Sequence, residues 1–593
     1  MFSRAIHRIG VVSLLIPAAL LLLPLYLYPL VQIVSRSFGG QGWSIANYLE
    51  LFSDPVILRV LYHTFRFALI IALLCLLLGY PLAYAMRIVS DRTRRTVTLL
   101  ILLPLWTSSL VRGFAWIVIL GRNGIVNTAL TDLGIIDEPL KLVYNKMGVY
   151  VGMVHIMLPF MVLSLYSTLS RMDLRLLSAA ESLGSRPISA FFWIVLPLSM
   201  PGVLAGALLV FMSSVGMFVI PALLGGLSDI TYIMLIEKQI NELNNWGLAA
   251  AMSVLLIVTT GVLTALYERT LNIETSAGIL GQVVRHVFQR GPIHLLVWRE
   301  RLLAKLFPMH ASQLATGKQS AHLGSRHLFV KCCSWWVLVW LVAPLAVLFP
   351  LAFSGAAYLH FPPQSYSIRW FENFFSRDDW ITPTITSLKV AILATIGVIV
   401  IGAPAAYAIV RGRFPGKGII TVILISPMIV PVLIFAISLY AIYVRFNLLG
   451  TVGGLVLAHI ILALPYVLVT VSAGLKSTDE SLEAAALTMG ASPVRAFWFV
   501  TLPVLRPAVI SAAFLAFLAS FDDVILALFL SGTSAKTLPV RMWEGIRYEI
   551  DPTIAAVSVM LILIAIGLKF AAERPVKRGA KSNIAEYCGR ANR

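Results

Sequence analysis

Two adjacent carboxylates, Asp522 and Asp523, stand within a long apolar run of the chain. Burying a charged group at membrane depth is costly, so acidic residues inside a membrane span are functional candidates by default. A pair of carboxylates at that depth can attract the ammonium group of a cationic solute. The alternative is that one aspartate caps or braces a helix end, and the sequence leaves both interpretations open.

Several aromatic residues in the same apolar regions have the chemistry to line a path for a cation, because ring faces attract ammonium groups. The candidates are Tyr84, Trp116, Phe218, Tyr407 and Trp543. Aromatic residues also anchor chains at membrane interfaces, which is the alternative for each of them. Three acids of a later polar loop are expected in solvent or against a partner protein: Glu544, Glu549 and Asp551.

The sequence carries no pattern typical of an enzyme centre. It contains neither H-E-x-x-H nor G-x-S-x-G, and its Gly-Lys pairs at 317–318 and 416–417 lack the other residues of a P-loop. The four cysteines, Cys75, Cys332, Cys333 and Cys588, have no metal-site spacing and suggest no disulfide framework. We therefore expect no catalytic residue, no metal site and no cofactor bound directly by this chain.

The elements that must hold these side chains are mostly apolar. Of 593 residues, 59% are hydrophobic and 12% are charged, and the mean hydropathy is +0.88. Soluble domains do not reach such values, and about 20 apolar residues suffice to cross a bilayer. The composition predicts an all-α polytopic membrane protein with about 12 transmembrane helices in two sets of six. The runs lie near residues 11–34, 60–86, 97–120, 149–169, 199–221, 247–267, 333–354, 386–410, 418–444, 450–472, 505–530 and 553–572.

The formal net charge is +19, and the positive residues are concentrated in alternate loops. Arg92, Arg94 and Arg95 form one such cluster, and the stretches 269–331 and 577–581 form others. This distribution is the positive-inside bias that orients membrane proteins, so we expect both termini in the cytoplasm. It also assigns the basic residues to anionic membrane lipid rather than to nucleic acid.

The two sets of spans are copies of one unit. Residues 158–201 align with residues 464–507 at a constant offset of 306 without a gap. Upstream, Gly79 and Pro104 align with Gly402 and Pro427 at an offset of 323. The change in offset predicts an extra loop of about 17 residues in the first copy, near 121–148. Two copies in the same orientation imply a pseudo-twofold axis along the membrane normal.

Both copies carry the pattern Ala-Ala-x-x-x-Gly, with Leu-Pro ending thirteen residues after the glycine, between the fourth and fifth spans. Alanine favours a helix, a glycine can end it in a left-handed conformation, and the proline suits the start of the next helix. An ordinary loop helix is the alternative for one copy, but two copies at equivalent places favour a shared function.

This pattern resembles the cytoplasmic EAA loop of binding-protein-dependent ABC importer permeases, where a short coupling helix docks on an ATPase subunit. The family's glutamate, six positions before the glycine, is replaced here by Ser178 and Ala484. Docking is therefore expected to depend on helix shape more than on that carboxylate. By resemblance, the coupling residues are Asp173, Ala179, Ala180, Glu181, Gly184, Ser185, Pro187, Asp479, Glu483, Ala485, Ala486, Gly490, Ala491 and Pro493.

The whole chain is similar to two type I importer permease domains fused in one polypeptide. Residues 211–226 and 520–556 resemble the first and second permeases of spermidine/putrescine systems. The resemblance implies four segments: a first permease domain over residues 1–268, a basic cytoplasmic linker over 269–332, a second permease domain over 333–573 and a cytoplasmic tail over 574–593.

The resemblance also implies the location and partners. These are the bacterial inner membrane, two ABC ATPase subunits that bind ATP with magnesium, and a periplasmic solute-binding protein. The expected solute is small and cationic or amine-bearing, such as a polyamine, an opine or an aminophosphonate. The alternatives are a ferric-iron or thiamine permease, or a secondary transporter with twelve spans. The proposed path residues are Asp522, Asp523, Phe218, Tyr84, Tyr407 and Trp543.

Overall fold

The computed structural model describes residues 12–173, 175–185, 187–271, 322–357, 361–549 and 551–567. Within these ranges all regular secondary structure is helical, apart from one isolated bridge between Ser354 and Tyr366. Ten helices there are long and apolar enough to cross a membrane. A bent pair, Lys417–Met428 with Val432–Arg445, counts as an eleventh span, and Thr553–Gly567 is a shorter apolar helix. The expected all-α polytopic fold is confirmed.

The first half of the chain runs through these elements: α2 (Ile16–Leu22), η1 (Leu23–Leu27), α3 (Tyr28–Ser37), α4 (Ala46–Ser53), α5 (Pro55–Ile88), α6 (Asp91–Leu105), α7 (Ser109–Leu120), α8 (Ile125–Asp132), α9 (Lys146–Leu169), α10 (Arg175–Ser182), α11 (Pro187–Ala190), η3 (Phe191–Val195), α12 (Leu196–Val215), α13 (Val219–Leu224), α14 (Tyr232–Asn241) and α15 (Trp246–Leu271). The second half repeats this order: α18 (His322–Ala352), α19 (Arg369–Ser376), α20 (Asp378–Arg411), α21 (Lys417–Ile425), η4 (Ser426–Met428), α22 (Val432–Arg445), α23 (Val452–Ser477), α24 (Glu480–Thr488), α25 (Pro493–Ala496), η5 (Phe497–Thr501), α26 (Leu502–Phe521), α27 (Ile525–Leu530), α28 (Leu538–Glu544), η6 (Gly545–Glu549) and Thr553–Gly567.

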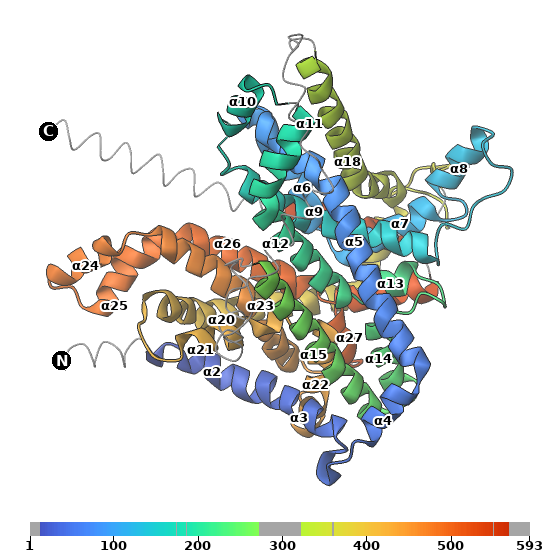
Figure 1. The fold of residues 1–593 in the computed structure, drawn as a ribbon. Coiled ribbons are helices and arrows are strands. Elements are labelled where there is room, and N and C mark those ends of the chain that lie inside the picture. The colour runs from blue at the N-terminus through green and yellow to red at the C-terminus, as the bar shows by residue number, and fades with distance from the viewer. Residues whose placement is uncertain are drawn as a thin grey trace.

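The internal repeat is preserved residue by residue in the structure. The long helices α5 and α20 each contain 34 residues and begin and end at aligned positions. The helices α12 and α26 each contain 20 residues and also align at both ends. The helix α8 lies in the extra loop of the first half, which Figure 1 shows away from α10. The predicted repeat and its insertion are therefore confirmed.

The fifth span of each half is broken, which the hydropathy pattern did not predict. The runs expected at 199–221 and 505–530 are each divided into two helices, α12 with α13 and α26 with α27. Both spans also begin earlier than expected, with a π-helical turn at Phe191 and Phe497. The breaks follow from local sequence, because Gly216 ends α12 and Asp522 ends α26. Asp522 and Asp523 consequently lie at a helix break instead of inside a continuous span.

The two halves are packed together through exchanged first helices. The helix α18 of the second half packs against α5, α6 and α7 of the first half, and η1 and α3 pack against α22 of the second. One hydrogen bond of this packing joins His155 Nε2 on α9 to Leu341 O on α18, at 2.9 Å. The halves therefore form one body in which neither core is complete without the other.

Of the three segment boundaries predicted from the resemblance, 268/269 falls within α15 and 332/333 falls within α18, whereas 573/574 lies outside the described residues. Residues 272–321 of the linker and the whole tail, 574–593, lie outside the described ranges. At the edges of the linker, α15 continues to Leu271 and α18 begins at His322.

A hydroxyl group from the second span holds the helix after each broken span. Thr64 Oγ1 on α5 accepts a hydrogen bond from Tyr232 N at the start of α14, at 2.8 Å. Ser387 Oγ on α20 accepts from Leu538 N at the start of α28, also at 2.8 Å. The four residues are aligned in the repeat, so the same bond positions equivalent helices in both halves.

We predict that Ser387→Ala lowers the free energy of unfolding by about 1–3 kcal/mol, because the buried N–H of Leu538 loses its acceptor. Thermal unfolding of the purified protein in detergent, followed by tryptophan fluorescence, measures the change. Ser511→Ala is the matched control, since its exposed hydroxyl bonds only Pro507 O of its own helix. Equal melting of both variants would show that the bond between α20 and α28 contributes nothing.

Candidate functional site

The two short helices α10 and α24 begin in the same way. Asp173 Oδ1 accepts a hydrogen bond from Arg175 N, and Asp479 Oδ1 accepts one from Ser481 N, both at 2.9 Å. A carboxylate at this position satisfies a main-chain N–H that the helix leaves unpaired. The hydrogen bonds from Ser481 lower the pKa of Asp479, so that cap stays ionised at neutral pH.

Both helices also end in the same way. Gly184 and Gly490 have φ angles of +83° and +89°, a left-handed conformation that favours glycine. Beyond them, Ser185 N donates to Ala180 O at 2.9 Å and Ala491 N donates to Ala486 O at 3.0 Å. Just before the two glycines, Leu183 N donates to Ala179 O and Met489 N donates to Ala485 O, which closes the last turn of each helix. The Ala-Ala-x-x-x-Gly pattern is therefore the carboxyl-terminal cap of a short helix, in two copies.

Each helix presents apolar side chains to its surroundings at matching positions. Leu183 and Met489 are 78% and 82% exposed, and Leu176 and Leu482 are about half exposed. Ala486 packs inward and is buried. Figure 1 shows α10 and α24 at separate tips of the molecule, away from the centre where the halves meet. The side chains of Glu181, Pro187 and Pro493 lie outside the described part of the chain.

Side-chain contacts with the second span distinguish the two short helices. Tyr407 Oη on α20 donates a hydrogen bond to Glu483 on α24, and Arg411 pairs with Glu480. Tyr407, expected on a solute path, thus contacts a short helix instead. The first half carries Leu177 at the position aligned with Glu483 and Ile88 at the position aligned with Arg411.

The break in each fifth span meets the break in the third span of the other half. Ser109 N, at the start of α7, donates to Asp522 Oδ2 at 3.3 Å. At the equivalent contact, a Cβ on Gly216 would lie 3.4 Å from Cβ of Pro431, which precedes α22. Gly216 aligns with Asp522 in the repeat, so one contact is apolar and its counterpart carries a charge.

Polar atoms without partners surround this charged contact. Arg112, one turn into α7, is 5% exposed, and its Nε and Nη1 atoms have no hydrogen-bond partner among the described residues. Asp522 Oδ1 is also unpaired within that part of the chain. Buried polar groups are rarely left unpaired. The interface between the halves therefore holds a buried donor and a buried acceptor that have no partner among the described residues.

Asp523 has a structural role beside its neighbour. Its Oδ2 accepts a hydrogen bond from Ala527 N at 3.2 Å, in the first turn of α27. His459 Nε2 of α23 lies 3.8 Å from the same oxygen, while His459 Nδ1 is 2.8 Å from Ser520 Oγ. Asp523 thus caps a helix within its own half, whereas Asp522 reaches across to the other half.

The structure brings two of the predicted path aromatics together. Phe218 of the first half and Trp543 of the second half are both buried, and their ring centroids are 5.6 Å apart. Trp116 packs against His155 and Trp340 instead. Tyr84 lies on α5, one turn from Tyr80. Phe218, Trp543 and Asp522 therefore lie at contacts between the halves, and so does Trp116 through Trp340 on α18.

Sequence reasoning did not select Arg112, His155 or His459, although a signal was present. Each is an ionisable residue inside an apolar run, which is the criterion that singled out Asp522 and Asp523. The ion pairs of Arg541 were also missed, and for these no local signal exists, because its partner Asp379 is 162 positions away.

Two homologous helical halves, matched short helices at the tips and polar helix breaks between the halves define a polytopic membrane protein of the transporter class. A family model, the binding-protein-dependent transport system inner membrane component, matches residues 76–270 and 398–575. These matches cover more than half of the chain, which therefore belongs to this family.

Three relatives of known name each match less than half of this chain. The spermidine/putrescine transport system permease protein PotB of Haemophilus influenzae is 38% identical over 226 residues, which are 38% of this chain and 79% of that protein. PotB of Escherichia coli is 36% identical over 233 residues, 39% of this chain and 84% of that protein. The putrescine permease PotI of E. coli is 34% identical over 212 residues, 34% of this chain and 74% of that protein. The chain is thus a fused permease subunit of an ABC importer and a multi-pass inner membrane protein, as the resemblance indicated.

We predict that Gly490→Ala frays the end of α24, because a left-handed conformation costs an L-residue about 1–2 kcal/mol. Trypsin should then cleave faster after the exposed Arg495, just beyond that end. Gly184→Ala should loosen α10 in the same way. Gly261→Ala in α15, where φ is not positive, is the control and should not change cleavage. Unchanged cleavage in Gly490→Ala would contradict the role assigned to the left-handed glycine.

Proposed function

We propose that α10 and α24 are coupling helices that dock on two ABC ATPase subunits, which bind ATP with magnesium. One observation carries this proposal: two short helices, 306 positions apart, share the same aspartate cap, the same left-handed glycine and the same exposed apolar positions. Neither exposed apolar pair has an intramolecular reason to be conserved between the two copies. The positive-inside bias supports a cytoplasmic position for these helices and for both termini.

We also propose that the solute is small and carries at least one ammonium group, with polyamines as the first candidates. The relatives named for spermidine and putrescine transport support this class over ferric iron or thiamine. The unpaired Oδ1 of Asp522, at the contact between the halves, offers a carboxylate to such a group. A periplasmic binding protein would deliver the solute, in keeping with the family to which the chain belongs.

A helix-breaking change in a coupling helix should uncouple transport more strongly than a charge change. We predict that Ala180→Pro or Ala486→Pro abolishes ATP-dependent uptake, because proline in a helix interior costs about 3 kcal/mol. Glu181→Gln should have little effect, because the two copies share no charge at this position. Uptake by vesicles and co-purification of the ATPase subunits measure both steps. Full uptake by both proline variants, or uptake without any ATPase, would favour a secondary transporter instead.

Removing one carboxylate charge at the helix break should weaken solute transport. We predict that Asp522→Asn raises the KM for putrescine uptake by about tenfold, equivalent to 1.4 kcal/mol of lost interaction, while the ATPase subunits still co-purify. Asp523→Asn should impair uptake less, since an amide oxygen can still cap α27. Asp132→Asn, on α8, is the control for loss of a carboxylate elsewhere. Unchanged uptake kinetics in both variants of the break would rule out an anionic site there.

A further inference from the structure

The long helix α20 is fixed to α24 at its carboxyl-terminal end. Tyr407 donates to Glu483, and Arg411 pairs with Glu480. Arg411 Nη2 also donates to two carbonyl groups just before α24, Leu475 O at 3.2 Å and Thr478 O at 3.1 Å. Both the side chains and the main chain at the start of α24 are thus tied to the last turns of α20.

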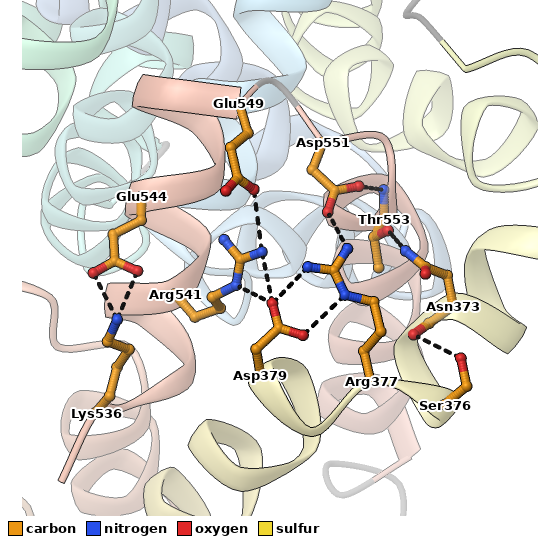
Figure 2. A network of polar contacts seen from close by, with 10 residues as sticks. All are labelled: Asn373, Ser376, Arg377, Asp379, Lys536, Arg541, Glu544, Glu549, Asp551 and Thr553. Carbon is orange, nitrogen blue, oxygen red and sulfur yellow. Dashed lines mark hydrogen bonds and ion pairs between the residues drawn. The ribbon is translucent and has the colours of Figure 1, made fainter. Parts of the chain in front are cut away.

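The opposite end of α20 is fixed to α28 through a network of ion pairs (Figure 2). Asp379, in the first turn of α20, accepts from Arg541 Nε at 3.1 Å and is 2.9 Å from Arg541 Nη2. Arg377 holds the same carboxylate with two further bonds, at 2.9 and 2.7 Å. Arg541 Nη2 also lies 3.2 Å from Glu549, and Arg377 Nη1 lies 3.8 Å from Asp551. The two guanidinium groups therefore join α20, α28 and the start of the last helix.

Burial makes the Arg541 contact a strong attachment. The side chain of Arg541 is only 6% exposed, and its guanidinium lies 4.6 Å from the ring centroid of Trp380 on α20. Isolated surface ion pairs contribute little, but a buried charge that loses its partner is strongly destabilising. Asn373 adds a bond to Thr553 Oγ1 at 2.7 Å on the same side of the network (Figure 2). Relative motion between α20 and α28 at this end is therefore strongly opposed.

The equivalent helix of the first half, which has the same length, lacks the ion-pair attachment but keeps a longer contact at its other end, where Arg87 Nη2 donates to Met172 O at 3.5 Å. Met172 aligns with Thr478, and Tyr84 aligns with Tyr407. On α5, Val56 and Ile88 occupy the positions of Asp379 and Arg411. On α14 and α10, Leu235 and Leu177 occupy the positions of Arg541 and Glu483. The Asp379–Arg541 ion pair and the carboxylates that meet Tyr407 and Arg411 are therefore specific to the second half, whereas the tyrosine and an arginine bond to the main chain before the short helix occur in both halves.

The attached helix α28 reaches the contact between the halves. Two residues after Arg541, Trp543 packs against Phe218 at the break of the fifth span in the first half. A helix of 34 residues is about 51 Å long at 1.5 Å per residue, enough to cross the membrane. A continuous set of contacts thus runs from α24 along α20 to α28 and to the other half.

We propose that α20 transmits the movement of α24 to α28, with Tyr407–Arg411 and Asp379–Arg541 as its two attachment points. The proposal rests on the proposed docking of an ATPase on α24. Tyr407, Arg411, Asp379 and Arg541 are positioning residues in this scheme, and coupling between the two sides of the membrane is carried by the second half. The first half follows through the contact between Phe218 and Trp543.

The test uses the full chain with its ATPase subunits in lipid nanodiscs. The four native cysteines are replaced, and an environment-sensitive fluorophore is attached to Tyr548→Cys, an exposed position next to the Arg541 network. Trapping the ATPases with ATP and vanadate should change the emission of this label. Tyr407→Phe with Arg411→Met breaks the α24 attachment and leaves α24 itself unchanged. Asp379→Val with Arg541→Leu replaces the other attachment by the apolar residues of the first half.

We expect each double variant to lose the vanadate-dependent emission change, and the quadruple variant to lose no more than either, because attachments in series are not additive. Ile88→Ala and Leu235→Ala, at the matching positions of the first half, should retain the emission change. Thermal unfolding of each complex shows whether a variant is folded. A retained emission change in either folded double variant, or equal loss in the first-half controls, would overturn the proposal.

The same experiment separates this inference from the proposed function. If no ATPase co-purifies with the unmodified chain, the proposed docking fails before any variant is compared. If the ATPase co-purifies and hydrolyses ATP but both double variants retain the vanadate-dependent emission change, docking stands and transmission through α20 is refuted.

Discussion

The structure depends on one constraint: in a bilayer, every main-chain N–H and C=O group must find a partner within the protein. Continuous helices meet this requirement without help, except where an interior proline removes a donor, as Pro81 does in α5 and Pro404 does in α20. A break in a helix releases N–H groups at a depth where water cannot replace the lost partners. The breaks here are supplied with acceptors from side chains: Asp522 accepts from Ser109 N, and Asp523 accepts from Ala527 N. The two carboxylates therefore also serve as main-chain acceptors at the breaks, whereas Gly216 and Met217 stand at the aligned positions of the first half.

This requirement explains why the two halves differ although they share one architecture. Both halves break the fifth span at aligned positions, and each break meets the third-span break of the other half. With Gly216 and Pro431, the contact is apolar and close. With Asp522 and Ser109, the same contact leaves one carboxylate oxygen unpaired. A fused repeat can thus keep a symmetric scaffold while placing charged groups, Asp522 and Arg112, at one of the two equivalent contacts.

The parts that could be predicted from the sequence are those whose signal is local. The offset of 306 aligned Asp173 with Asp479 and Gly184 with Gly490. In the structure the two aspartates cap their helices in the same way, and the two glycines have the same left-handed conformation. The helix breaks were not predicted, because Gly216, Met217 and Phe218 are as apolar as a continuous span. Tyr407 was predicted on the solute path for its aromatic ring. Its contact with Glu483 was not predicted, because it depends on where α20 lies relative to α24, which no sequence pattern specifies.

The distribution of charge between the halves has a common physical basis. The first half relies on apolar residues at Val56, Leu177 and Leu235, whereas the second half carries carboxylates or a guanidinium at each matching position. Apolar contacts between helices allow small sliding movements, because dispersion forces are weak for any one atom pair and have little directionality. Charge-assisted hydrogen bonds fix both distance and angle. The second half is therefore held at the α28 end of α20 by directional contacts, whereas the matching positions of the first half are apolar.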